Sequence, residues 1–424
     1  MFILYDLIFL VISIVYLPIY LLRGKFQRGF MARLGILPKD LELNNPIWIH
    51  AVSVGEAQAV RVLVEGLRKA YPAQKFVIST VTATGNKIAK TFAKDGDLVT
   101  YLPLDFSFIV RKTINKIKPK IFILAETEIW PNLISYLYKK NIPTAVVNGR
   151  ISGRSFKGYR FIKFLAQPIL TKIRLFCVQT ERDAERLRSL GVAADKIKVT
   201  GNMKFDITID TQKDYSTYRL KLGLLPDEKL LVAGSTHPQE EEIILGVYQE
   251  LCVTYPDLKL LIAPRHPERS ADIAALIEKF GFSPVRLSSL NSRTQRTQSN
   301  SRTIFILDSI GELLNYYAIA EVIFVGGSLV KKGGHNILEP AALGKPVLFG
   351  PQMFNFWDIA ELFLSAQAAL VVSGPEELKT KISDLLSDPS LIAQLGKRAR
   401  EVVFRNQGAS PRNLEFLSFF FTAD

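Results

Sequence analysis

The chain has 424 residues, enough for two or three domains of ordinary size. Hydrophobic residues make up 48% and charged residues 22%, which excludes an intrinsically disordered chain. The net charge of +14 indicates an anionic partner, which could be nucleic acid, a membrane surface or a phosphorylated substrate. Two distant cysteines, Cys177 and Cys252, exclude a disulfide framework and a Cys-based zinc site. Four histidines without an HExxH motif argue against a His-rich metal site.

The amino-terminal segment 1–22 is almost entirely apolar, with Asp6 as its single charge. As a helix it would be about 33 Å long, close to the hydrocarbon core of a bilayer. A basic stretch without acids, RGKFQRGFMAR, follows, which is the reverse of the charge order in a cleaved signal peptide. The sequence predicts one uncleaved anchor, spanning or embedded, with the rest of the chain in the cytoplasm against anionic headgroups. A buried amino-terminal helix is the alternative.

The remaining chain alternates short apolar runs with helical patterns. Segment 56–70 has the periodicity of an amphipathic helix. The runs predicted to be strands are 46–52, 75–80, 120–126, 144–149, 175–180, 230–236, 258–264, 303–308, 321–327 and 346–350. Such alternation is typical of parallel sheets covered by helices, so we expect an α/β fold with two doubly wound domains facing a cleft. The polar stretch 206–229 separates the two series, and 286–303 reads as an exposed loop.

The first candidate for chemistry is Glu56, in HAVSVGEAQAV, where a strand ends and a helix begins. A carboxylate in the first turn of a helix commonly stabilises the helix dipole, and spacing alone favours this structural role. The functional interpretation is a general base that removes a proton from a hydroxyl nucleophile. The helix dipole would lower the pKa of this carboxyl, so another feature, such as desolvation, would have to offset it.

Two further acids and a lysine follow strand ends. In AETEIWPNL, Glu126 and Glu128 alternate along an extended chain, so we expect only one of them to face the cleft. Capping of the next helix is the structural alternative. In VTGNMKFD, Lys204 precedes the interdomain segment, where its ammonium group could stabilise a leaving phosphate, although a lone lysine is more often simply solvated.

The segment NGRISGRSFKGYRFIKF is basic and aromatic, and contains no acid. Its composition suits an anionic amphiphile, with cations for phosphates and aromatic rings for acyl chains or sugar faces. A single-stranded nucleic-acid platform or a solvated basic helix are the alternatives. The candidate binding cations are Arg150, Arg154, Lys157 and Arg160.

A Gly-rich βαβ unit, FVGGSLVKKGGHNILEPAALGKPVLFGP, lies in the second half. Its glycines could let backbone N–H groups approach a phosphate. Glu339 could bind the hydroxyls of a ribose, although Asn336 and Glu339 also have the spacing of a helix capping pair. The turns APRHPERS and LDSIGELL could complete a nucleotide pocket. The chain has no GxxxxGK[ST] and no convincing GxGxxG, which disfavours an ATPase or a dehydrogenase.

Taken together and in this order, the segments resemble the 3-deoxy-D-manno-octulosonic acid (Kdo) transferase family of the lipid A pathway. The matching pieces are SVGE, ETEIWPNLI, NGRISGRS, GNMKFD, PRHPER, FVGGSLV, GGHNILEP, GPQMFNF and NQGA. The resemblance implies a GT-B glycosyltransferase that needs no cofactor and no bound metal. It implies transfer with inversion from CMP-Kdo to the lipid A precursor (lipid IVA) at the inner membrane.

The resemblance also implies roles for individual residues. Glu56 would be the proton acceptor, and Glu126 and Lys204 would stabilise the transition state. The residues implied to bind CMP are Arg265, His266, Ile310, Gly311, Glu312, Asn336, Ile337, Leu338 and Glu339. The family often has Met where this chain has Ile310, which matters little if the backbone makes that contact.

The expected organisation is an anchor (1–22), an acceptor-binding domain (23–205), a nucleotide-sugar domain (206–395) and carboxy-terminal helices that return to the first domain (396–424). The nearest rivals are another GT-B transferase that uses a UDP-sugar and a nucleotide-sugar epimerase. A membrane-tethered, non-catalytic lipid- or nucleotide-binding relative and a nucleic-acid-binding protein are the non-enzyme alternatives.

Overall fold

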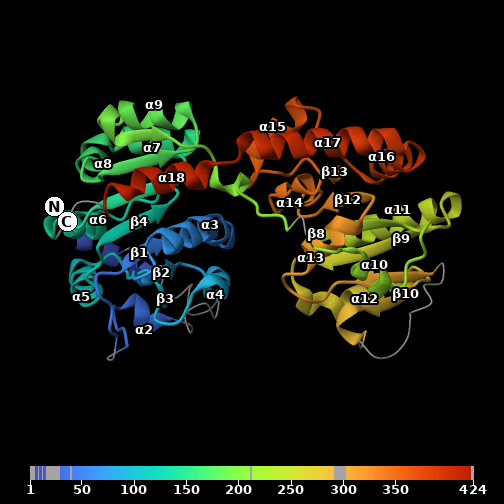
Figure 1. The fold of residues 1–424 in the computed structure, drawn as a ribbon, viewed down its shortest axis with the longest axis horizontal. Helices are drawn as coiled ribbons and strands as arrows, with labels where there is room; N and C mark the ends of the chain where they lie inside the picture. The colour runs from blue at the N-terminus through green and yellow to red at the C-terminus, as the bar shows by residue number, and fades with distance from the viewer. Residues whose placement is uncertain are drawn as a thin grey trace. The chain divides into compact units, whose positions relative to one another are not determined.

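The structure is a computed structural model. It describes residues 5–7, 9–11, 13–15, 29–38, 41–210, 213–290 and 302–421. The chain forms two compact units: unit 1 comprises Met1–Asp206 and Asn406–Asp424, and unit 2 comprises Ile207–Arg405. Each unit is a seven-stranded parallel α/β domain (Figure 1). The two Rossmann-like sheets that the alternation of apolar runs and helices predicts are therefore confirmed.

Unit 1 has the strand order β3-β2-β1-β4-β5-β6-β7. Its strands are β1 (Ile47–His50), β2 (Phe76–Thr80), β3 (Leu98–Tyr101), β4 (Ile121–Ala125), β5 (Thr144–Gly149), β6 (Leu175–Val178) and β7 (Ile197–Val199). Its helices are α2 (Phe30–Arg33), α3 (Val54–Ala70), α4 (Ala83–Phe92), α5 (Ser107–Ile117), α6 (Pro131–Lys139), α7 (Gly153–Phe161), α8 (Lys163–Leu170), α9 (Glu181–Ser189), η1 (Ala194–Lys196), η2 (Met203–Phe205) and α18 (Ala409–Ser418).

Both faces of the unit 1 sheet are buried, which explains why its central strands are continuous apolar runs. Side chains alternate across β1: Ile47 and Ile49 belong to a core with α3, α4 and α18, whereas Trp48 belongs to a core with α5, α6 and α9. All residues of β1, β2 and β4 are buried. Functional side chains of this unit must therefore come from the loops at the sheet edges.

The carboxy-terminal segment belongs to unit 1 and is held there by Asp206. Its carboxylate accepts hydrogen bonds from the N–H groups of Gly408 (2.7 Å) and Ser410 at the start of α18. Arg412 and Asn413 then bond to Thr200 at 2.8 and 3.0 Å. The return to unit 1 begins at residue 406 rather than 396, because α17 (Pro389–Asn406) packs through Leu395 into the core of unit 2.

Unit 2 has the strand order β10-β11-β9-β8-β12-β13-β14. Its strands are β8 (Lys229–Thr236), β9 (Leu258–Pro264), β10 (Ser283–Arg286), β11 (Thr303–Ile306), β12 (Val322–Val325), β13 (Val347–Phe349) and β14 (Leu370–Val371). Its other helices are α10 (Ser216–Leu222), α11 (Glu240–Thr254), η3 (Pro267–Arg269), α12 (Ser270–Lys279), η4 (Leu287–Ser289), α13 (Leu313–Ile319), α14 (Leu338–Ala342), α15 (Trp357–Ser365) and α16 (Pro375–Ser387).

The predicted anchor falls mainly outside the described residues. Those described between 5 and 15 are helical, and Asp6 bonds to the Ser107 N–H (3.1 Å) and the Asn132 amide (2.7 Å). Leu10, Val11 and Ile14 are exposed. Within the described part of the chain, no helix has the length and apolar character needed to cross a membrane. Both cysteines are free, in agreement with the sequence analysis.

Candidate active site

Glu56 lies in the first turn of α3, immediately beyond the carboxyl end of β1. Ser53 caps the helix and accepts a hydrogen bond from the Glu56 N–H (3.4 Å). The Glu56 carboxylate reaches back, with Oε2 2.7 Å from the Val52 N–H and Oε1 2.8 Å from the Ser53 hydroxyl. This is a variant of the capping box, so the structural role considered for Glu56 is realised. Each oxygen receives one hydrogen bond and retains a lone pair for another proton donor.

Burial raises the pKa of the Glu56 carboxyl, and the nearby Glu126 carboxylate raises it further. The Val52 N–H, the Ser53 hydroxyl and the Lys204 ammonium lower this pKa and only partly offset the burial. Desolvation is thus the feature that opposes the helix dipole. The side chain is suited to accept a proton, because a carboxylate with a raised pKa is a stronger base.

Glu126 and Lys204 form an ion pair in the same region of unit 1. Lys204 Nζ is 3.1 Å from Glu126 Oε1, and both side chains are largely buried. Two asparagines hold the short helix η2 that carries the lysine. Asn148 at the end of β5 accepts from the Met203 N–H, and Asn202 accepts from the Lys204 N–H, each at 2.9 Å. Asn148 lies in the NGRISGRS motif, but its positioning role depends on Met203, 55 residues away, and has no local sequence signal.

The extended backbone on which the expectation for Glu126 and Glu128 rested is not present. Glu126 has a φ of 60°, in the left-handed region, so the chain after β4 turns sharply and the alternation of an extended strand does not apply. Both carboxyls lie near Glu56: Glu126 raises the pKa of Glu56, and Glu56 raises that of Glu128. Burial is the main cause that raises the pKa of Glu128 to about 7. The sequence could not show that Glu128 lies near Glu56, because this proximity depends on the backbone turn at Glu126.

The basic, aromatic segment forms α7 and the start of α8. Arg154, Lys157 and Arg160 are exposed, and Arg150 is partly buried. Half of the aromatic rings, Phe156 and Tyr159, pack against the core of unit 1. The other two are on the surface, Phe161 being 88% and Phe164 74% exposed. The surface therefore combines cations with exposed rings.

The residues implied to bind CMP follow strands of the unit 2 sheet. Arg265 and His266 come directly after β9, and Ile310, Gly311 and Glu312 lie between β11 and α13. Because β9 and β11 are adjacent and parallel, their carboxyl ends share one edge of the sheet. Ile310 is 79% exposed and Gly311 has a φ of 93°, so this turn presents backbone to its surroundings.

The segment from Asn336 to Glu339 forms the start of α14, after β12. Asn336 Nδ2 donates to Glu339 Oε1 (3.1 Å), and Asn336 Oδ1 accepts from the Leu338 N–H (3.1 Å). The two side chains therefore interact, but they do not form the capping box considered for this pair, because the N-cap of α14 is Ile337, without a side-chain cap bond. The side chains of Ile337 and Leu338 are fully buried in unit 2. Burial raises the pKa of Glu339, and the Asn336 amide and Arg265 lower it.

The prediction that the glycines after β12 offer their N–H groups to a phosphate is wrong for residues 327–329. These N–H groups donate to the carboxylate of Glu240, at 2.7 Å from Gly327, 2.9 Å from Ser328 and 2.9 Å from Leu329. The His237 N–H donates to the same carboxylate at 3.0 Å. An internal carboxylate therefore takes the place of an external anion in this loop.

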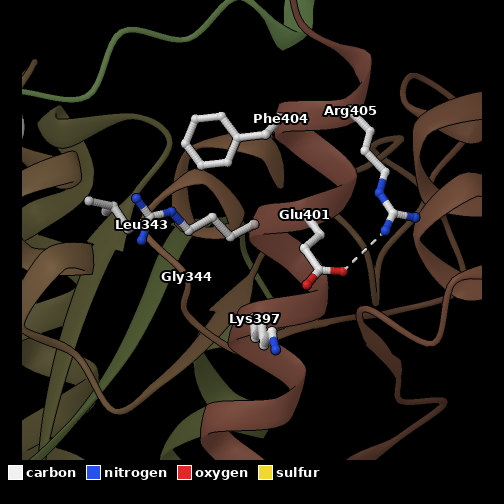
Figure 2. Close-up of a pocket in the computed structure, with 7 residues that line it drawn as sticks. Leu343, Gly344, Lys397, Glu401, Phe404 and Arg405 are labelled. Carbon is white, nitrogen blue, oxygen red and sulfur yellow. Dashed lines mark ion pairs between the residues drawn. The ribbon is translucent and has the colours of Figure 1, made fainter.

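A pocket of about 590 Å³ lies elsewhere on unit 2, between the turn after α14 and helix α17. Lys397, Glu401 and Phe404 project from α17 in Figure 2, and Glu401 pairs with Arg405 at 3.6 Å. None of the residues that line this pocket belongs to those predicted to bind CMP. Among the described residues, no group of three or more His, Cys, Asp or Glu side chains is arranged to hold a metal ion.

The two parallel α/β units place the chain in a class of proteins built from two Rossmann-like domains. Two Rossmann-like units of this kind also occur in UDP-GlcNAc 2-epimerase from Neisseria meningitidis, which is 15% identical, with a TM-score of 0.60 over 88% of this chain and 100% of that chain. An S. aureus MnaA structure with UDP is 17% identical, with a TM-score of 0.57 over 90% and 98% of the two chains. At these identities the likeness concerns the fold alone.

Sequence similarity gives the family. The model of the family 3-deoxy-D-manno-octulosonic-acid transferase (kdotransferase) matches residues 28–207. The 3-deoxy-D-manno-octulosonic acid transferase of Haemophilus influenzae is 38% identical over 88% of this chain and 86% of its own. The protein of that name from Chlamydophila psittaci is 33% identical over 91% of this chain and 89% of its own. The chain belongs to the Kdo transferase family and is a glycosyltransferase that transfers Kdo.

Proposed function

We propose that the chain transfers Kdo from CMP-Kdo to a hydroxyl of the lipid A precursor lipid IVA, with inversion and with Glu56 as the general base. The observation that carries this proposal is the environment of Glu56. Its carboxylate is held by the Val52 N–H and the Ser53 hydroxyl, has its pKa raised by burial, and lies close to Glu126 and Lys204.

The proposed reaction is a displacement at the anomeric carbon of Kdo. The Glu56 carboxylate accepts the proton of the acceptor hydroxyl as the hydroxyl oxygen bonds to that carbon. The bond between the anomeric carbon and the phosphate oxygen breaks, and CMP leaves with the bonding electrons. Positive charge develops at the sugar as in other glycosyl transfers. The carboxylate of Glu126 would stabilise that charge, and the ammonium group of Lys204 would stabilise negative charge on the leaving group.

Unit 2 is proposed to hold the CMP-Kdo donor. The arrangement of three segments supports this: Arg265 and His266 after β9, the turn Ile310 to Glu312, and Asn336 to Glu339 after β12 all follow the carboxyl ends of parallel strands. Ligands of open α/β sheets bind at that edge. Glu339 is proposed to accept hydrogen bonds from the ribose hydroxyls, and the exposed turn at Gly311 to contact the nucleotide through its backbone.

The acceptor is proposed to bind α7 and the start of α8. Arg154, Lys157 and Arg160 would pair with the phosphates of the disaccharide, and the exposed rings of Phe161 and Phe164 would contact acyl chains. This use of the basic surface accounts for the net charge of +14 without nucleic acid as a partner.

Residues 1–22 are proposed to anchor the protein in the inner membrane, with the catalytic units in the cytoplasm. The exposed Leu10, Val11 and Ile14 support a membrane-facing side of this segment. The bonds from Asp6 to Ser107 and Asn132 support a second side that packs on unit 1. These contacts favour an embedded segment over a spanning one.

The test is mass spectrometry of lipid IVA after incubation with the full-length protein and freshly generated CMP-Kdo. We expect a product heavier by one or more Kdo residues, and UDP-sugars should give none. Absence of a mass shift with folded protein and intact acceptor would contradict the proposed donor and acceptor.

A further inference from the structure

Three of the four histidines of the chain come together in unit 2. His237 Nε2 lies 2.9 Å from His335 Nε2, and the two ring planes are nearly parallel, with an interplanar angle of 10° and centroids 5.1 Å apart. The ring of His266 is edge-on to His237 at 5.9 Å. Only His266 belongs to the residues that the family resemblance assigns to CMP, so His237 and His335 have no role assigned to them.

Two features of unit 2 position the two histidines. The first is Gly327, where a Cβ atom would lie 2.8 Å from Cδ2 of His335 and 3.4 Å from Cδ2 of His237. Its φ of 69° is also unfavourable for other residues. The second is Glu240, fully buried, which accepts the four N–H groups of His237, Gly327, Ser328 and Leu329. The glycine-rich loop and the carboxylate therefore bring the two histidines together.

Basic side chains surround the pair. Arg265 and His266 lie near both rings, and Lys332 and Arg269 lie near His237. Acids balance part of this charge: Glu241 pairs with Arg269 at 2.9 Å, and Glu268 lies 3.5 Å from His266. Burial and these basic side chains lower the pKa of His237 to about 4 and that of His335 to about 3. Both rings are therefore neutral at pH 7 in the absence of a ligand.

The hydrogen bond between the two rings fixes where their protons are. Two neutral imidazoles carry two N–H groups in total, and one of these lies between the Nε2 atoms. The ring that accepts this bond must carry its own proton on Nδ1. The pair thus offers one Nδ1–H donor, and an anion that supplied negative charge would favour uptake of a third proton by the pair.

We propose that the His237–His335 pair binds an anionic oxygen of the sugar nucleotide donor, through an Nδ1–H group directed at its phosphate or at the carboxylate of its sugar. This inference rests on the proposed function, since it assumes that unit 2 holds CMP-Kdo. The pair lies where such an oxygen is expected: His237 follows β8, and His335 immediately precedes Asn336. It takes over the anion-binding role that the N–H groups of the glycine-rich loop cannot have.

The test uses the full-length protein labelled with ¹⁵N-histidine, whose four rings can be assigned with His237→Gln, His335→Gln and His266→Gln, which leaves His50 as the fourth. His50 serves as the internal reference, because it is buried in unit 1 and bonded to Ser79. We expect CMP to move an Nδ1 signal of the pair towards the position of a protonated nitrogen, and cytidine to leave it unchanged. This result would identify the phosphate as the anionic group that the pair binds. A response to CMP-Kdo but not to CMP would identify the sugar carboxylate.

Two results would overturn the proposal: no response of the pair to either compound, or an equal response to cytidine, which has no anionic group. Binding measurements provide a second test. His335→Phe keeps an aromatic ring but removes the N–H, and should weaken CMP or CMP-Kdo binding by roughly 10- to 100-fold. His335→Gln keeps an N–H donor and should weaken it less. Equal affinities for wild type and both variants would contradict the proposal.

Failure of the proposed function would look different from failure of this inference. If the wild-type protein binds CMP through the pair but makes no Kdo product, the proposed reaction is wrong and the anion site stands. If product forms while the pair does not respond to the donor, the reaction stands and the inference is wrong. Lys379→Gln, which breaks an exposed pair with Glu250, is the control and should change neither readout.

Discussion

The turn after β1 in unit 1 and the turn after β8 in unit 2 both lead into a helix with a glutamate in its first turn. The two glutamates have opposite environments. Glu56 is partly buried, and each of its oxygens accepts one hydrogen bond. Glu240 is fully buried, and its two oxygens accept four backbone N–H groups between them. The same residue type at equivalent places in similar sheets is available for chemistry in one unit and saturated in the other.

The comparison extends to the charges around each turn. Three carboxyl groups, Glu56, Glu126 and Glu128, gather in unit 1, and Lys204 lies near the first two. In unit 2, Arg265, Arg269 and Lys332 gather around the neutral histidine pair, beyond the carboxyl ends of the strands. An acidic cluster suits removal of a proton and stabilisation of a cationic sugar, whereas a cationic cluster suits an anionic donor. The same parallel α/β fold thus carries side chains suited to proton removal in unit 1 and to binding of an anionic donor in unit 2.

The largest effect is expected for Glu56→Gln. Glutamine at this position can still complete the capping arrangement with Ser53, so the fold and CMP affinity should be retained. Loss of the base should reduce the rate of Kdo transfer by roughly 10²- to 10⁴-fold. The rate is measured by mass spectrometry of the lipid product, and Glu65→Gln, at an exposed position of the same helix, is the matched control. Near-normal turnover of Glu56→Gln would remove Glu56 from the role of base.

Glu240→Gln tests whether the buried carboxylate of unit 2 holds the glycine-rich loop. The variant amide can accept some of the four N–H groups but places its own donors against the rest, so buried groups lose their partners. We expect unfolding in urea to show a loss of about 1–3 kcal/mol and CMP binding to weaken. Glu242→Gln, on the exposed side of the same helix, should behave like wild type. Unchanged stability of Glu240→Gln would show that the carboxylate does not hold the loop.

The sequence was sufficient to predict the fold because the central strands are buried on both faces and therefore appear as uninterrupted apolar runs. It also made Glu56 and Lys204 candidates, since both follow strand ends, although spacing alone favoured a structural role for Glu56 and a solvated side chain for Lys204. It could not reveal two features. The left-handed backbone of Glu126 contradicts the alternation expected of a strand, and it brings Glu128 close to Glu56. Glu240 and Gly327 are 87 residues apart, so no local pattern shows that one fills the loop of the other.

A smaller effect is expected from the basic surface of unit 1. Replacing Arg154, Lys157 and Arg160 together by Gln should raise the KM for the lipid acceptor roughly tenfold, because exposed cations each contribute up to about 1 kcal/mol. The KM for CMP-Kdo should not change, and the effect should shrink as salt increases. The control replaces three lysines of another surface, Lys87, Lys90 and Lys94, and removes the same charge. An equal rise in the acceptor KM for both variants would indicate only a general charge effect.

The smallest effect is a change in pH dependence caused by Glu128→Gln. With Glu56 as the proposed base, transfer needs its ionised form, so the rate is expected to fall at acidic pH. Burial and the Glu56 charge raise the pKa of Glu128 to about 7, so Glu128 is mostly protonated over this acidic limb. The variant should leave the acidic limb in place and change the rate profile only near pH 7, where the Glu128 charge appears.

Stability should respond to the same substitution. The pKa of Glu128 is raised from 4.5 to about 7 in the folded protein. Between these values the folded state binds more protons than the unfolded state, so the free energy of unfolding falls as pH rises through this range. Glu128→Gln should make that fall shallower, measured by urea unfolding from pH 4 to pH 8, whereas Glu65→Gln should not. An unchanged rate profile together with an unchanged slope would mean that Glu128 is electrostatically independent of Glu56, and the acidic cluster of unit 1 would then reduce to Glu56 and Glu126.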